Sequence, residues 1–479
     1  MEGYDAVVVG SGPNGLAAAV TLARAGRSVL VREAADSVGG GTRSAELTLP
    51  GFVHDVCSAI HPLGASSPVF RSWPLREYGL EWIHADLPLV HPFEDGSAVA
   101  LARDVDETAE GLGRDGDAYR RLVGVVAAEW RRLEETLLGP LVRVPRHPLA
   151  LARFAFSAAR SADALARSAF RCERARALLA GCAAHSMLPL ETSPSASFGL
   201  VLLALGHVAG WPVARGGSGA IPAALAAHLR ALGGVIETSS PVESLRELPR
   251  AGAVLCDVSP PGLLRVAGNA LPRRYARALR RYRFGPGAFK LDLALDGPVP
   301  WRAAEAGRTA CLHVGGTLAE IAEAERAPWQ GRIAERPHVL VAQQTAADPA
   351  RAPAGRHTVW AYCHVPNGST EDATERIERQ IERFAPGFRA RVLARSVRSP
   401  ADLEAYDRNP VGGDINGGVQ DWRGLLARPA FRLVPYATPL PGLFLCSAST
   451  PPGGGVHGMC GFLAAQAALR GPLARRTLF

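Results

Sequence analysis

Residues 4–33 read YDAVVVGSGPNGLAAAVTLARAGRSVLVRE, and this stretch carries the strongest structural signal of the chain. An apolar run, a glycine-rich turn, an Ala-rich segment and a second apolar run predict a strand, a turn, a helix and a second strand. The turn spells G-x-G-x-x-G with Gly10, Gly12 and Gly15. The first glycine permits the tight bend, the second lets the backbone approach a diphosphate, and the third packs helix against strand. The stretch therefore predicts a unit that binds a dinucleotide at the N-terminus of its helix.

The residues expected to bind the nucleotide lie in this unit and in a second glycine cluster at residues 39–43, which read GGGTR. Glu33 ends the second strand, twenty-three positions after Gly10, where an acidic side chain can accept hydrogen bonds from ribose hydroxyls. The expected contacts are Gly10, Ser11, Gly12, Pro13, Asn14, Gly15, Glu33, Ala34, Gly40, Gly41, Thr42 and Arg43.

A third glycine-rich segment lies near the C-terminus. Residues 442–446 predict a strand, residues 452–458 read PGGGVHG, and residues 459–469 predict an apolar helix. Glycines at a helix start let the backbone approach a flat ring and donate N–H groups to its carbonyl. The alternative is that these glycines form an ordinary loop. The expected contacts are Gly455, Val456 and Met459. A nucleotide site at one end of the chain and a ring site at the other favour FAD over a nicotinamide nucleotide.

Longer motifs extend this pattern along the chain. Besides Glu33 and the glycines at 39–41 they are PGF at 50–52, GWPVARGGSGAIPAAL at 210–225, GPGAFKLDLALDGPVPW at 285–301 and LFLCSASTPPGGGVHGMCG at 443–461. Together they resemble the FAD-dependent phytoene desaturase and carotenoid isomerase branch of the amine oxidase superfamily, and within it the oxidoreductases grouped with pyridine nucleotide-disulfide oxidoreductase domain-containing protein 2. The resemblance implies FAD as cofactor, a two-domain architecture and an adenine contact through the backbone of Val242. It does not indicate a substrate.

The sequence departs from that family pattern at two places. Gly41 stands where many members carry an arginine that holds the diphosphate, and Arg43 is the candidate to replace it. Residues 457–459, His-Gly-Met, lack the aromatic residue that amine oxidases of the superfamily place beside the flavin. This second departure disfavours amine oxidation.

The predicted fold is α/β, with a discontinuous Rossmann-type FAD-binding domain and a second substrate domain of mixed sheet and helices. The FAD-binding domain is assigned residues 1–74, 211–285 and 431–479, and the substrate domain its helical part at 75–210 and its mixed sheet at 286–430. From residue 289 to 296 apolar and polar residues alternate, which predicts a half-buried strand.

Lys290, on that strand, is the only lysine in the chain, beside 52 arginines. An ammonium group can lose its proton when desolvated, whereas a guanidinium cannot. In the family that the chain resembles, a lysine on this strand ahead of an apolar-Pro-Trp turn, here residues 298–301, holds a water near flavin N5. Lys290 is therefore a predicted catalytic residue. The alternative is a solvent-facing lysine beside Asp292 and Asp296.

Histidines supply the second catalytic candidate. His457 lies within the C-terminal glycine turn, and the resemblance implies a position near the flavin. His54, Asp55 and His61 follow the second glycine cluster closely and could relay protons, although an isolated histidine is more often a packed core residue.

Composition argues against several function classes. The net charge is +8, but the arginines are spread among acidic residues without interleaved aromatics, so nucleic-acid binding is not expected. Eight cysteines without paired spacing predict core residues rather than a redox or metal site. An N-terminus that enters a strand at once and no apolar run long enough for a bilayer predict a cytoplasmic protein. An apolar substrate leaves peripheral membrane contact open, and the oligomeric state is not indicated.

The predicted activity is that of an FAD-dependent oxidoreductase that transfers hydride between flavin N5 and a C–C or C=C unit of an apolar small molecule. Three alternatives remain at this point. They are a redox-neutral isomerase that uses reduced FAD, an amine oxidase, and a flavin-containing binding protein without turnover.

Overall fold

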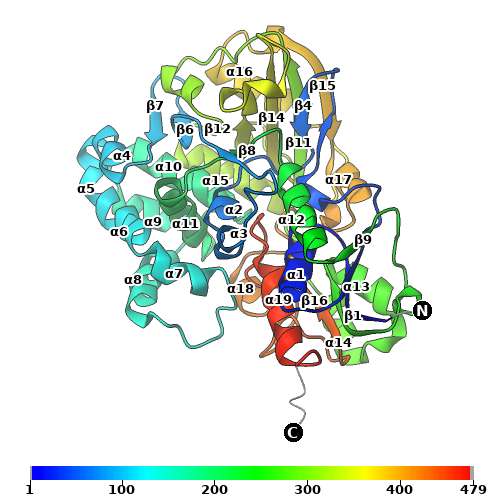
Figure 1. Ribbon diagram of the computed structural model, residues 1–479. Coiled ribbons are helices and arrows are strands. Elements are labelled where there is room, and N and C mark those ends of the chain that lie inside the picture. Colours follow the sequence, from blue (N-terminus) through cyan, green and yellow to red (C-terminus); the bar gives the residue numbers. More distant parts are fainter. Residues whose placement is uncertain (1–2, 475–479) are drawn as a thin grey trace.

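The structure is a computed structural model that describes residues 3–474, and it contains two large sheets with helices around them (Figure 1). The first sheet has five parallel strands in the order β16-β10-β1-β2-β9. The strands are β1 (Tyr4–Val9), β2 (Val29–Arg32), β9 (Val235–Glu237), β10 (Ala251–Cys256) and β16 (Leu443–Leu445). They come from three separate parts of the chain, so the sheet is built discontinuously.

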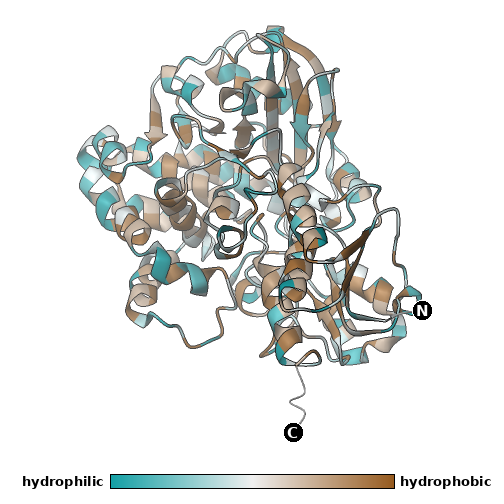
Figure 2. Cartoon of the chain, viewed as in Figure 1, coloured by the Kyte–Doolittle hydropathy of each residue, from teal (hydrophilic) through white to brown (hydrophobic). Residues whose placement is uncertain are grey.

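Helices cover both faces of this sheet, because successive residues of a strand face opposite sides. Val8 packs in the cluster of one face, and Val9 packs in the cluster of the other. The helices of the first face are α1 (Pro13–Arg24), α12 (Ala220–Ala231) and α19 (Met459–Arg470), and those of the second are α13 (Pro260–Ala267) and α14 (Arg273–Arg280). Figure 2 shows hydrophobic strands between these helices. The predicted Rossmann-type α/β fold is confirmed.

The second sheet is mixed and has seven strands in the order β15-β11-β14-β13-β12-β6-β7. Strands β6 and β12 are parallel, and the other neighbours are antiparallel. The strands are β6 (Leu89–Pro92), β7 (Ala98–Leu101), β11 (Gly287–Leu295), β12 (Cys311–Val314), β13 (Val339–Ala342), β14 (His357–Val365) and β15 (Val392–Arg398). The amphipathic helix α16 (Thr374–Phe384) packs its apolar residues against one face of this sheet.

Strand β11 is buried along its whole length, so the prediction of a half-buried strand is wrong. Its apolar residues, among them Leu291 and Leu293, pack under α16 as the alternation indicates. Its polar residues face the opposite side, where strand β4 (Val53–Asp55) lies across the sheet. The alternation in the sequence distinguishes an apolar from a polar face, whereas burial depends on what packs against each face.

Most of the remaining helices gather beside the mixed sheet, and the short helices α2 (Pro62–Ser66) and α3 (Pro68–Ser72) follow β4 in the chain. The helices beside the mixed sheet are α4 (Val105–Gly111), α5 (Gly116–Tyr119), α6 (Val125–Ala128), α7 (Trp130–Leu137), α8 (Pro148–Ala158), α9 (Ala162–Ala169), α10 (Glu173–Ala184), α11 (Ser195–Val208) and α15 (Leu318–Arg326). The segment 75–210 also supplies β6 and β7, which the expectation of a mainly helical segment missed. Within residues 3–474 no helix is both long and apolar enough to cross a bilayer. All eight cysteines are free and six are buried, which agrees with their prediction as core residues.

Candidate active site

The glycine turn between β1 and α1 is closed by Asp257, which follows β10. The backbone N–H of Gly15 donates to Oδ2 of Asp257 at 2.8 Å. A Cβ on Gly15 would lie 2.2 Å from the carbonyl oxygen of Gly10, and a Cβ on Gly12 would lie 2.8 Å from Oδ2 of Asp257. Gly10 has a φ of +98°, which favours glycine. No side chain larger than hydrogen fits at these positions without displacing the backbone or Asp257.

Asp257 is a residue that sequence reasoning missed. It is buried at the carboxyl end of a parallel strand next to β1, which is the edge where open α/β sheets bind ligands. Burial raises the pKa of Asp257 to about 7, although the hydrogen bond from Gly15 opposes the rise. The signal that could have identified it is the run AVLCDV at 253–258, where an acid ends a buried strand.

Glu33 connects the two N-terminal glycine segments. Its carboxylate accepts hydrogen bonds from Ser11, from the backbone N–H at 2.8 Å and from the hydroxyl at 2.6 Å. It also lies 3.3 Å from Nη2 of Arg43. The carbonyl oxygen of Ser11 accepts from the N–H of Gly39 at 3.0 Å. The structure therefore brings the predicted nucleotide contacts around Ser11, Glu33 and Arg43 into one place.

The segment that carries Val242 lies at the same end of the sheet. The carbonyl oxygen of Glu33 accepts from the N–H of Ser240 at 2.7 Å, and that of Ala35 accepts from the N–H of Ser239 at 2.7 Å. Val242 itself is buried in the second-face cluster of the parallel sheet. Predicted ribose and adenine contacts that are about 200 residues apart in sequence are thus neighbours in the fold.

Arg43, the candidate replacement for the family's arginine, points toward groups of its own segment. Its guanidinium donates to the carbonyl oxygen of Ser37 at 2.8 Å and pairs with Glu33. It also lies 5.6 Å from the ring centre of Tyr406, at the end of α17 (Pro400–Tyr406). These contacts fix the orientation of Arg43 and connect α17 to the nucleotide end of the site.

A cavity of about 640 Å³ begins at the glycine segments and runs over the mixed sheet. At its first end it is lined by Pro13, Asn14, Gly41, Thr42, Gly455, Val456 and His457. Its floor is the polar-face side of the mixed sheet, with Ala288, Lys290, Cys311, Leu340, Trp360 and Tyr362. Helical spacing places Leu151, Phe154, Ala155 and Ala158 of α8, and Phe198, Val201 and Leu202 of α11, along its wall. Among the described residues that line it, Lys290 is the only charged one, and no carboxylate is present.

Lys290 is buried in the floor of this cavity, with 2% of its surface exposed. The solvent-facing alternative is therefore wrong, because the polar face of β11 is covered. The ammonium group pairs with Asp292 and lies 5.9 Å from the ring centre of Trp360. Burial raises the pKa of Asp292 to about 6, although Lys290 opposes the rise. The pair places an exchangeable proton at the cavity floor without net charge.

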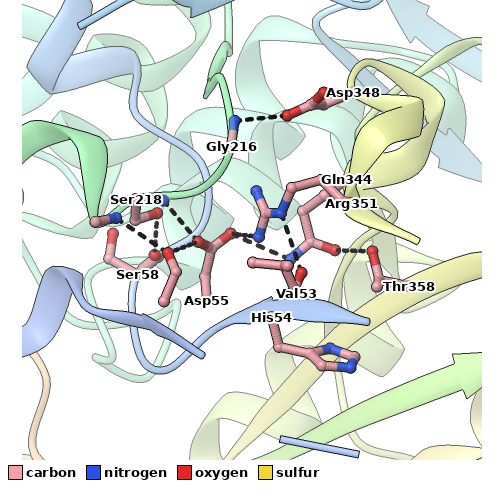
Figure 3. Close-up of polar contacts among 12 residues, drawn as sticks. Val53, His54, Asp55, Ser58, Gly216, Ser218, Gln344, Asp348, Arg351 and Thr358 are labelled. Atoms are coloured by element: carbon pink, nitrogen blue, oxygen red, sulfur yellow. Dashed lines mark hydrogen bonds and ion pairs between the residues drawn. The ribbon is translucent and has the colours of Figure 1, made fainter. Parts of the chain in front are cut away.

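His54 and Asp55 lie behind this floor rather than in the cavity. Nδ1 of His54 is 3.7 Å from Oδ1 of Asp292, and burial lowers the pKa of His54 to about 3. Asp55 pairs with Arg351 at 2.9 Å and accepts from the N–H of Ser218 at 2.7 Å (Figure 3). Burial alone would raise the pKa of Asp55, but Arg351 and Ser218 hold it below its ordinary value. His54 and Asp55 therefore connect β4 to its neighbours, which is a structural role.

His457 and His61 both line the cavity as neutral rings, because burial lowers each pKa to about 4. The N–H of Met459 donates to Nδ1 of His457 at 3.0 Å, so the proton of the neutral ring is on Nε2. The hydroxyl of Ser218 donates to the carbonyl of Ser58, so it accepts from Nε2 of His61 at 2.8 Å and leaves Nδ1 of His61 without a proton. Nε2 of His457 and Nδ1 of His61 have no hydrogen-bond partner within residues 3–474. The two rings thus give the cavity an unpaired donor and an unpaired acceptor, besides Nε1 of Trp360 and Oδ1 of Asn14, which also lack a partner there.

The site residues fit an elongated nucleotide cofactor with a polar ring. The glycine turn forms a cradle that a Cβ would fill, and Oδ1 of Asn14 is a further buried atom without a partner in the described chain. Gly455 and Val456 line the first end of the cavity, whereas Gly10, Glu33, Val242 and Met459 lie outside its lining. The predicted residues are therefore divided between the cavity lining and the strand ends of the parallel sheet.

Comparisons with known proteins agree with this geometry. The family described as flavin containing amine oxidoreductase matches residues 14–469. The chain is 26% identical over 546 residues to pyridine nucleotide-disulfide oxidoreductase domain-containing protein 2 of Rattus norvegicus, which covers 98% of this chain and 93% of that protein. It is 27% identical over 421 residues to phytoene dehydrogenase of Streptomyces griseus, which covers 81% and 77% respectively. A solved oxidoreductase from Methanosarcina mazei has a TM-score of 0.65 at 17% identity, with 97% of this chain and 99% of that chain covered.

The match begins at residue 14, at the end of the glycine turn, and covers Glu33, the mixed sheet and the C-terminal glycine segment. The predicted resemblance to the amine oxidase superfamily and its phytoene desaturase-like branch is confirmed. The chain belongs to the flavin containing amine oxidoreductase family and is an FAD-dependent oxidoreductase.

Proposed function

We propose that this oxidoreductase acts on a C–C or C=C unit of an apolar small molecule, as a dehydrogenase of the desaturase type. The observation that carries the proposal is the lining of the cavity, which is apolar except for a few neutral polar groups and Lys290. A buried apolar wall binds apolar surface favourably, at about 25 cal/mol per Å² removed from water. The phytoene dehydrogenase relative acts, by its name, on a substrate of this kind.

The same lining disfavours a cationic amine as substrate. An ammonium ion placed in a buried site needs a counter-charge, because desolvation without one costs several kcal/mol. The cavity has no carboxylate among its described lining residues, and its one charged side chain, Lys290, already neutralises the nearby carboxylate of Asp292, so no counter-charge is left for an ammonium substrate. Amine oxidation is therefore the weaker proposal, although the family name includes it.

FAD, when bound, supplies the transfer of hydride at flavin N5. The backbone at Gly12 would bind its diphosphate, Glu33 its ribose, and the backbone of Val242 its adenine. Gly455 and Val456 would hold the ring carbonyl through their N–H groups, whereas the N–H of Met459 is already donated to Nδ1 of His457. His457 would add the Nε2–H donor that the structure leaves without a partner.

Lys290 is the proposed catalytic residue of the protein itself. Its ammonium group lies on the cavity floor and is paired with Asp292, which is fully buried. When a C–C unit becomes C=C, the hydride leaves for the flavin and the adjacent carbon loses a proton. Nζ of Lys290 is in position to hold a water that would accept this proton, with the carboxylate of Asp292 as the final base. The surrounding aromatic residues, Trp360 and Tyr362, exclude bulk water from this place.

The proposal is tested with paired compounds in the absence of oxygen. The purified protein is mixed with a long apolar alkene or alkane and, separately, with the primary amine of the same length. We expect the apolar compound to bleach the flavin absorbance and the amine to leave it unchanged. Bleaching by the amine with peroxide release on re-oxidation would establish amine oxidation instead. An isomerase would convert the apolar compound only after prior reduction of the flavin, with no net bleaching.

A further inference from the structure

One row of side chains runs across the floor of the cavity, from strand to strand of the mixed sheet. Lys290 of β11 lies opposite Tyr362 of β14, and Tyr362 lies opposite Leu340 of β13. Leu340 in turn lies opposite His313 of β12. Residues opposite one another in antiparallel strands face the same side of the sheet. Neighbouring strands are about 4.8 Å apart, so three spacings place His313 about 14 Å from Lys290.

The far end of this row is covered by His185, which lines the cavity, whereas His313 lies outside the lining. Nε2 of His185 is 3.0 Å from Nε2 of His313. The ring of Trp211 meets both imidazoles at steep angles, with ring centres 5.6 Å apart in each case. The carbonyl oxygen of His185 accepts from the side chain of Asn416 at 3.1 Å. Because Nε2 of His185 is bonded to His313, Nδ1 is the ring nitrogen left for the cavity.

The hydrogen bond between the two imidazoles contains one proton, because both rings are neutral. Burial lowers the pKa of His185 to about 3 and that of His313 well below its ordinary value. Nδ1 of His313 is buried against Gly181 of α10 and has no hydrogen-bond partner within residues 3–474. A proton on this nitrogen would be a buried donor without an acceptor, which is costly. His313 therefore carries its proton on Nε2 and donates it to His185, whose own proton is on Nδ1.

This end of the cavity thus presents one neutral donor, the Nδ1–H of His185, beside the apolar surface of Leu340 and Trp211. A neutral N–H group among apolar side chains binds an acceptor oxygen of an uncharged molecule. A carboxylate would lose its hydration here without a counter-charge, because Lys290 is about 14 Å away and already pairs with Asp292. A carbonyl or hydroxyl oxygen is therefore the group that fits.

We infer that the substrate is an apolar chain with a carbonyl or hydroxyl oxygen, and that His185 is a specificity-determining residue that donates its Nδ1–H to this oxygen. Three bonds of an extended chain span about 3.5 Å, so 14 Å corresponds to roughly twelve bonds. The bond that is oxidised beside Lys290 should lie at about this separation from the oxygen. The oxygen contact is independent of the proposed function, whereas the separation rests on it.

The oxygen contact is tested by binding without turnover. The flavin of the FAD-loaded protein is first reduced, so that it cannot accept a hydride, and calorimetry measures the Kd of tetradecan-2-one and of pentadecane, which have equally long chains. In His185→Phe, which keeps a ring but has no donor, the ketone should bind about five- to tenfold more weakly and pentadecane nearly as before. His185→Asn has an amide close to the position of Nδ1 and should recover part of the ketone affinity.

A control variant on the cavity wall separates the hydrogen bond from general packing. Phe198→Leu, on α11, should weaken the binding of both compounds to a similar extent, because Phe198 offers only apolar surface. The flavin content of each variant reports its fold. Equal weakening of the two compounds in His185→Phe would overturn the oxygen contact, and so would tighter binding of tetradecanoate than of the ketone to the parent protein.

The separation is tested with the oxidised flavin and ketones of different length. Octadecan-2-one should bleach the flavin, decan-2-one should not, and mass spectrometry of the product should find the new C=C roughly twelve bonds from the carbonyl oxygen. A new C=C next to the carbonyl would overturn the separation. If the ketone depends on His185 for binding but no chain bleaches the flavin, the oxygen site stands and the proposed function is wrong. If ketone and hydrocarbon bleach the flavin equally, and His185→Phe does so as well, the proposed function stands and this inference is wrong.

Discussion

The backbone N–H of Met459 donates to Nδ1 of His457 at 3.0 Å, and this single contact decides which ring nitrogen of His457 carries the proton. Because burial holds the pKa of His457 near 4, the ring is neutral at pH 7 and its other nitrogen is a donor. The carbonyl oxygen of His457 is also held, by the hydroxyl of Ser67 at 2.7 Å. The contact from Met459 thus orients the ring, and the contact from Ser67 holds the backbone that carries it.

We expect the donor of His457 to stabilise the electron-rich, reduced form of the bound ring. Removing it in His457→Leu should make the flavin reduction potential more negative by about 30–60 mV, which corresponds to a hydrogen bond of about 1.5–3 kcal/mol to a charged group. Dye-coupled reduction followed by absorbance measures this shift without a substrate. His228→Leu is the control, because His228 is equally buried but lies on α12 outside the cavity. Equal shifts in both variants would contradict the assignment.

Lys290 should be needed for the reaction but not for binding the cofactor. Lys290→Met removes the proton and the charge, and we expect flavin reduction by the substrate to slow by about 100-fold or more. Lys290→Arg keeps a positive charge that does not dissociate, so it should be nearly as slow. Stopped-flow absorbance measures the reduction rate, and the flavin content of each variant is the control. Full activity of the arginine variant would leave only an electrostatic role for Lys290.

The N-terminal part of the site was predictable because its signal is local. In the glycine turn around Gly10, steric demands within a few residues determine the sequence, and the turn is found where the motif places it. Glu33 likewise ends its strand close to Ser11. The assignment of FAD follows from motifs at the two ends of the chain, and it is confirmed by the family match.

Other features depend on contacts between distant segments, which no local pattern contains. The burial of Lys290 results from β4 crossing the polar face of β11, so the alternation that identified the face did not show whether it met solvent. Asp257 accepts a hydrogen bond from the N–H of Gly15, which lies 242 positions earlier in the sequence. The strands β6 and β7 are short and join a sheet whose next strand in sequence, β11, begins only at Gly287, far beyond the end of β7 at Leu101, which explains why they were missed.

Asp257 should make the stability of the protein depend on pH. Burial raises the pKa of Asp257 from 3.8 to about 7, so its protonated form is favoured in the folded state. The resulting stabilisation is complete below pH about 4 and is lost as the pH rises through about 7. Asp257→Asn stays neutral and still accepts from Gly15. Its unfolding free energy, relative to the parent protein, should therefore rise by up to about 4 kcal/mol between these pH values.

Thermal midpoints of the FAD-free protein, measured from pH 4 to 8, provide the check for Asp257. Asp296→Asn is the control, because it removes an exposed carboxylate on the end of β11. The difference in thermal midpoint between Asp257→Asn and the parent should increase with pH, whereas the difference between Asp296→Asn and the parent should stay constant. If the difference in thermal midpoint stays constant for both variants, Asp257 is ionised over the whole range from pH 4 to 8.

Gly461 joins the two ends of the chain where they form the cofactor site. A Cβ on Gly461, in α19, would lie 1.7 Å from the carbonyl oxygen of Asn14 in the first turn of α1. Gly461→Ala must therefore move α19 away from α1, which should cost about 1–3 kcal/mol or more and lower the FAD content. Gly111→Ala, at the end of α4 with open space around it, should leave both unchanged or raise stability slightly. Thermal midpoint and flavin absorbance report the two effects. If Gly461→Ala lowers stability but keeps its FAD, the helix contact supports the fold without positioning the cofactor.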